Sequence, residues 1–175
     1  MKYAILALTW QLGMRATAQY PQLHYSGTNA KIIEAIAEAN KILADPAFYL
    51  AIDTMKDIGN TTFSAQQISA EMKNMKVIEV VRWRPKVTRL GLRSKANAST
   101  LTNIGINYAN LNRSRNSIVN TLIHEAVHAT DWFNHHPRFL YTHDGNQEED
   151  PSVSAPNRIG DLGEVFAGKD QPAAN

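Results

Sequence analysis

The chain of 175 residues contains no cysteine. Disulfide bonds and Cys-type metal sites are therefore excluded, and any transition-metal site has to use histidine and carboxylate ligands. No repeat, low-complexity tract or long linker divides the sequence. With 43% hydrophobic and 19% charged residues, it has the composition of a single soluble domain that is long enough to bury its own core.

Only one extended apolar stretch is present, from Tyr3 to Met14, and it is too short to span a bilayer, which needs about 20 residues. Lys2 precedes this stretch and Ala16-Thr17-Ala18 follows it. That order is typical of a cleaved secretory signal. We therefore expect residues 1–18 to be a signal peptide, with a secreted or periplasmic mature protein that is not stably inserted in the membrane. If this segment instead packs on the domain, the protein would be cytoplasmic.

Strong net charge is also missing. Cleavage after Ala18 would remove Lys2 and Arg15 and leave 16 basic against 16 acidic residues. A near-neutral protein has no global attraction for nucleic acid. The locally basic stretch from Arg82 to Lys95 is interpreted as the solvated face of strands, so no nucleic-acid partner is expected.

Three helices are predicted in the first part of the chain. Apolar residues recur at helical spacing in the first, which ends at Asp45-Pro46. Asp45 can cap a second helix with Pro46 in its first position. Ser64 and Gln67 have the spacing of a capping box for a third. The expected helices lie within residues 27–44, 46–59 and 65–74.

The middle of the chain changes to the alternating, β-branched pattern of strands. Strand candidates occupy residues 76–84, 86–94 and 103–111, and Pro85 suggests a turn or an edge position between the first two. A further helix follows. Helices, then a small sheet, then a helix indicate an α+β fold.

That later helix carries His-Glu-x-x-His at His124, Glu125 and His128. At 100° per residue the two histidines lie one turn apart on one face, with Asp131 in line with them. The opposite half of the helix is apolar, so one face is expected to pack while the other presents the imidazoles. The list of apolar positions is Ile118, Val119, Leu122, Ile123, Ala126, Ala129 and Phe133.

Two imidazoles one turn apart can both reach one Zn²⁺ ion. Glu125 lies beside the pair, where a carboxylate can accept a proton from a metal-activated water during attack on a carbonyl and later deliver it to the leaving amine. The alternative is a solvent-exposed helix with two histidines and no metal.

The motif "HEAVH" on a helix after a small sheet resembles the zincin metallopeptidases, and "LIHEAVHATD" is similar to zincins with an Asp three positions beyond the second His. The resemblance implies a zincin-like fold of N-terminal helices, a small mixed sheet, the motif helix and a loop-rich C-terminal part. It also implies Zn²⁺ held by His124 and His128, with Glu125 as general base. The metzincin extension is absent, since Asp131 and Asn134 stand where Gly and His are required.

A third metal ligand has to come from elsewhere, and His143 is the first choice. Glu164, which resembles the downstream glutamate of gluzincins, and Asp131 are the alternatives. A packing face formed by Ile159, Leu162 and Phe166 is expected to turn Glu164 outward, and Gly160 and Gly163 weaken its helix as a platform. The remaining carboxylates considered are Asp144 and Asp161.

An oxyanion needs a nearby donor, and Tyr141 and Arg138 are the nearest candidates. The alternatives are a packed aromatic side chain for Tyr141 and a surface charge for Arg138. Ile104 to Leu111 is expected either as an edge strand that pairs with extended substrate or as an ordinary internal strand. Gln19 to Gly27 is interpreted as a pro-segment or a loop.

The sequence thus predicts a zinc-dependent metallopeptidase domain over residues 19–167, acting on a peptide or protein, with a disordered tail at 168–175. The alternative is a noncatalytic binding or effector domain that keeps a structural or vestigial metal site. Retention of Glu125 favours the enzyme, because a structural site needs no base. Oligomeric state is left open.

Overall fold

A computed structural model of the chain describes residues 20–56, 58–59, 61–83, 96–100, 103–133 and 153–169, with backbone only at 96–100 and 131–133. The predicted signal peptide, Pro85 and the strand predicted at 86–94 lie outside these residues. The described part is mixed helix and strand, in agreement with the predicted α+β class.

The first three helices form where local capping signals predicted them. They are α1 (Ala30–Leu43), α2 (Pro46–Asp53) and α3 (Ala65–Lys73). The Asp45 side chain accepts a hydrogen bond from the amide of Ala47 at 2.8 Å. Ser64 and Gln67 complete the capping box of α3. Only the end of α2 differs. The helix ends at Asp53 with Thr54 as its C-cap, six residues before the expected end at Gly59.

The four described strands form one sheet in the order β1-β2-β4-β3. Their bounds are β1 (Gln22–His24), β2 (Val77–Trp83), β3 (Ala96–Thr100) and β4 (Asn103–Asn107). Strands β1, β2 and β4 are parallel, and β3 is antiparallel to β4. Residues 22–24, interpreted from the sequence as part of a pro-segment or a loop, therefore belong to the sheet.

Of the two alternatives for residues 104–111, an edge strand beside the site or an ordinary internal strand, the structure shows the internal strand, over Asn103–Asn107. β4 lies between β2 and β3, and Ile104 to Asn107 are all buried, as in an internal strand. The chain then turns into a 3-10 helix, η1 (Tyr108–Asn110). β3 is the outermost of the described strands on that side of the sheet.

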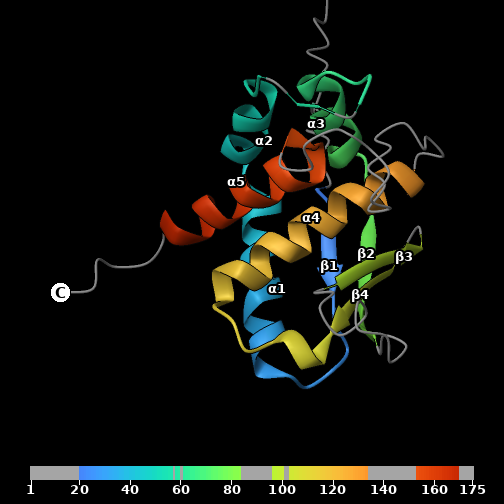
Figure 1. Ribbon diagram of the computed structural model, residues 1–175, viewed down its shortest axis with the longest axis vertical. Helices are drawn as coiled ribbons and strands as arrows, with labels where there is room; N and C mark the ends of the chain where they lie inside the picture. Colours follow the sequence, from blue (N-terminus) through green and yellow to red (C-terminus); the bar gives the residue numbers. More distant parts are fainter. Residues whose placement is uncertain are drawn as a thin grey trace, which may run out of the picture.

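Two long helices complete the described part, α4 (Arg115–Phe133) and α5 (Ala155–Lys169). Figure 1 shows α4 crossing the middle of the molecule, with α5 along one side and the sheet at the other. α4 contacts α1, α3, α5, β3 and β4. Residues 155–169 of the C-terminal part, which was expected to be loop-rich, are helical, and α5 extends two residues into the stretch predicted as a disordered tail. Among the described helices, none is long and apolar enough to cross a membrane.

Candidate functional site

The site helix α4 begins at a local cap and continues through an apolar core. The amide of Ser117 donates to Ser114 Oγ at 3.1 Å, and the amide of Ile118 donates to the Ser114 carbonyl at 3.2 Å. Six of the seven positions predicted to pack are fully buried; the side chain of the seventh, Phe133, lies outside the described residues. The six are Ile118, Val119, Leu122, Ile123, Ala126 and Ala129.

In the part of α4 from Ile118 to Thr130, one line of residues is partly open to solvent. Between Ile118 and Thr130, every residue is buried except Asn120, His124 and His128, which are half-buried. These three recur every four residues and therefore share one face of the helix. The predicted face with the two histidines is confirmed as the partly open one, and its apolar opposite face as packed.

The two imidazoles converge on each other. His124 Nε2 and His128 Nε2 are 3.2 Å apart, with ring centroids 5.0 Å apart. An ion at about 2.0–2.1 Å from both nitrogens would see them at an angle of about 100–105°, close to the tetrahedral angle that Zn²⁺ adopts. The distance between the two Nε2 atoms is therefore compatible with a shared zinc ion.

Glu125 lies between the two histidines in the chain but is far less accessible than they are, with only 6% of its surface exposed. Burial of an ionised carboxylate is costly unless it is hydrogen-bonded or paired. If residue 125 served packing alone, an apolar side chain would carry a smaller desolvation cost. The buried carboxylate next to two convergent imidazoles is therefore the chemically unusual feature of α4.

Helix α5 packs antiparallel to α4 and covers one side of this line of residues. Asn120 Nδ2 donates to Asp161 Oδ1 at 2.9 Å and to Glu164 Oε2 at 3.0 Å. The expectation that Glu164 points outward is therefore wrong: α5 is rotated so that Glu164 faces α4. The glycines of α5 explain the rotation, since Gly160 and Gly163 lie directly against α4.

The third zinc ligand is not found among the described residues, where no three His, Asp or Glu side chains form a group that could hold an ion. Asp161 and Glu164 are both hydrogen-bonded to Asn120, one helical turn before His124. His143, Asp144, Tyr141 and Arg138 lie outside the described residues, as does the side chain of Asp131. The choice of His143, with Glu164 or Asp131 as the alternative, stays a prediction.

Sequence reasoning missed Arg113 and Asn120 as partners at this interface. Arg113 Nη1 donates to the Ser117 carbonyl at 3.0 Å and also to Thr121 Oγ1. Burial lowers the pKa of Arg113, and the negative charge of Glu164 acts in the opposite direction. Asn120 could have been found from its spacing, four residues before His124 on the same face.

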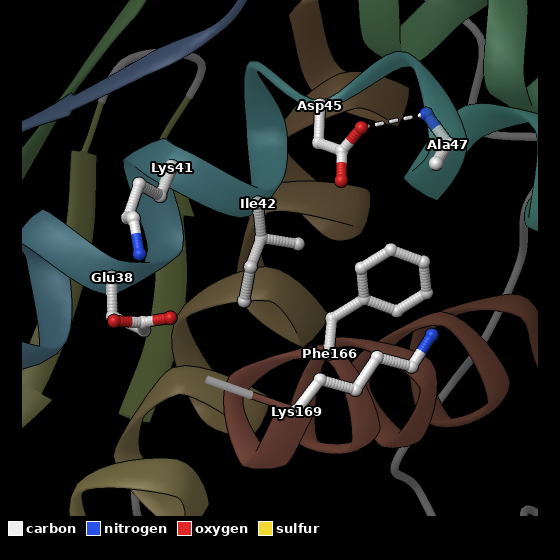
Figure 2. Close-up of a pocket in the computed structure, with 7 residues that line it drawn as sticks. All are labelled: Glu38, Lys41, Ile42, Asp45, Ala47, Phe166 and Lys169. Atoms are coloured by element: carbon white, nitrogen blue, oxygen red, sulfur yellow. Dashed lines mark hydrogen bonds between the residues drawn. The ribbon is translucent and has the colours of Figure 1, made fainter. Parts of the chain in front are cut away.

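A pocket of about 290 Å³ lies away from the histidine pair, between α1, α2 and the C-terminal end of α5. Figure 2 shows Ile42 and Phe166 facing into it, with charged side chains around them. Those charges have partners within the protein: Asp45 caps α2, Glu38 pairs with Arg115 at 3.6 Å, and the Lys169 ammonium lies 3.8 Å from the Phe166 ring centre. The histidine pair is the stronger candidate for function.

No family model matches the chain, and searches of curated proteins and of solved structures also gave no match.

Proposed function

We propose that the protein is a zinc-dependent metallopeptidase that hydrolyses a peptide bond with a metal-activated water. The observation that carries the proposal is the 3.2 Å separation of His124 Nε2 and His128 Nε2 on the one open line of a buried helix. A buried glutamate between the two histidines adds the base that a structural site would not need.

In this proposal His124 and His128 bind the ion, and a third ligand, His143 or else Glu164 or Asp131, completes the site. When bound, zinc supplies a water of lowered pKa, about 7, and draws charge from the scissile carbonyl. Glu125 accepts the proton of the attacking water and passes it to the leaving amine. Tyr141 is the proposed donor to the developing oxyanion.

The substrate is proposed to be a peptide or protein in extended form. The strand proposed to pair with the substrate is β3, in place of residues 104–111. β3 is antiparallel to β4 and contacts α4. An extended chain added to a sheet edge is held mainly through backbone hydrogen bonds, which accept many side chains. Export through a cleaved signal at residues 1–18 remains part of the proposal.

The test is a comparison of metal content and turnover in wild type, Glu125→Gln and His124→Ala. Glu125→Gln is expected to keep about one zinc per chain while hydrolysis of a casein substrate falls by about 10²–10⁴-fold, the usual contribution of a positioned base. His124→Ala is expected to lose both. His24→Ala is the matched control, because His24 pairs with Glu79 on the sheet at 2.9 Å and not with α4.

A wild-type protein that takes up no zinc from a stoichiometric zinc solution would contradict the proposal. The noncatalytic alternative, a binding or effector domain with a structural or vestigial metal, gives a different result. In that case all zinc-loaded variants would lack hydrolysis, and Glu125→Gln would behave as wild type.

A further inference from the structure

Gly160 of α5 lies directly against α4 at Asn120 and His124. A Cβ atom added to Gly160 would lie 3.1 Å from His124 Cβ, from the Asn120 carbonyl oxygen and from Asn120 Oδ1. Two of these three atoms cannot rotate away, because the carbonyl oxygen and the Cβ of His124 are fixed by the backbone of α4. A side-chain carbon at residue 160 would thus crowd the backbone of α4 at Asn120 and His124.

We propose that Gly160 is a positioning residue for the zinc site, which it serves by letting α5 support the backbone of α4 at His124. The inference rests on the proposed function, since it concerns the metal that the histidine pair would hold. A methyl group at residue 160 would require a displacement of a few tenths of an ångström. Metal–ligand distances tolerate only about 0.2 Å, so a displacement of that size is enough to disturb the pair.

Helix α5 is not free to absorb the displacement. Asn120 holds it through Asp161 and Glu164. One turn along, Gly163 lies against Ile123, where an added Cβ would be 2.4 Å from Cδ1. These contacts hold α5 against α4 over the turn that follows Gly160, so we infer that the added methyl group acts on His124 and on the spacing of the two Nε2 atoms.

Gly163 provides a matched control. Its added Cβ meets first the Cδ1 atom of Ile123, the end of a fully buried side chain, and not the Asn120 carbonyl oxygen or the His124 Cβ that Gly160 meets. Gly163→Ala should therefore cost stability without moving the imidazoles. Gly168→Ala is the second control, because the nearest atom to its added Cβ is 3.8 Å away, at Asn116 Nδ2.

The experiment measures zinc affinity by competition with a chromogenic chelator, and the visible absorption spectrum of the Co²⁺-substituted protein, for the three glycine variants. Gly160→Ala is expected to bind zinc at least about tenfold more weakly, within the range found when residues behind a metal ligand are changed. Its Co²⁺ spectrum should also change. Gly163→Ala and Gly168→Ala are expected to keep wild-type affinity and spectrum, even where the melting temperature of Gly163→Ala is lower.

Equal zinc affinity in Gly160→Ala and wild type, or equal losses in Gly160→Ala and Gly163→Ala, would overturn the assignment. If Gly160→Ala does not fold, the proposal is tested on the wild-type protein. An NMR cross-peak is expected between the Gly160 Hα and His124 Hβ protons. Absence of that cross-peak overturns the proposal. Failure of the proposed function gives a different result: the wild-type protein would bind no zinc but would still show the cross-peak.

Discussion

At the scale of the residue, Asn120 connects the two longest helices through one amide group. Its Nδ2 atom donates to Asp161 and Glu164 on α5, and its own backbone lies one turn before His124. Both acceptors are carboxylates, and hydrogen bonds to charged groups contribute about 1.5–3 kcal/mol when they are protected from water. Asp161 is exposed, so its share is smaller.

Asn120→Ala is therefore expected to lower the free energy of unfolding by about 1 kcal/mol, since the higher helix propensity of alanine offsets part of the lost bonding. Urea titration measures the change from the unfolding midpoint. Asn112→Ala, at an exposed position before α4, should stay within about 0.5 kcal/mol of wild type. An Asn120→Ala midpoint equal to that of Asn112→Ala would contradict the bridging role.

At the scale of the element, the first turn of α4 is stabilised by a local cap, and the histidine pair lies much further along the helix. Ser114 satisfies the amide of Ser117 in the first turn. His124 lies ten residues later, about 15 Å along the helix axis. The first turn and the histidine pair are therefore expected to respond independently to substitution.

Ser114→Ala removes the cap and is expected to cost about 1 kcal/mol of stability, with zinc affinity within twofold of wild type. Ser64→Ala, which removes the cap of α3, should cost a similar amount and gives the reference for a cap remote from α4. Chemical denaturation and a zinc titration are measured on the same samples. Zinc binding that fell with Ser114→Ala alone would show that the site depends on the start of α4.

At the scale of the whole molecule, the site helix is enclosed by elements from every part of the described chain. α1 and α3 precede the sheet, β3 and β4 belong to it, and α5 is the last described element; all five contact α4. The convergence of His124 and His128 therefore depends on the folded state. A ligand that needs the folded site adds to its stability.

Zinc at about 100 times its dissociation constant is expected to add about 2.7 kcal/mol to the free energy of unfolding. For a domain of this size that corresponds to a rise in melting temperature of about 5–10 °C. Scanning calorimetry with zinc, and again after a chelator is added, measures the difference. His128→Ala should show no such rise, and an identical rise in that variant would place the zinc elsewhere.

Local features of the fold could be predicted because short stretches of sequence encode them. The caps at Asp45 and Ser64, the helical spacing in α1 and the buried half of α4 each depend on residues within one or two turns of one another. The same holds for the pairing of His124 with His128, since a separation of four residues places both on one face of any α-helix. Their common face was therefore determined before any tertiary contact formed.

Only the tertiary structure decided what meets α4 and the strands. The three residues of β1 carry too little pattern to be recognised and become a strand through their parallel partner β2, more than fifty residues later. β4 became internal because β3 covers its other edge. Gly160 and Gly163 weaken an isolated helix, yet against α4 they permit the close approach that turns Glu164 toward Asn120. Such outcomes depend on which surfaces meet in space, a property that no local stretch of the sequence contains.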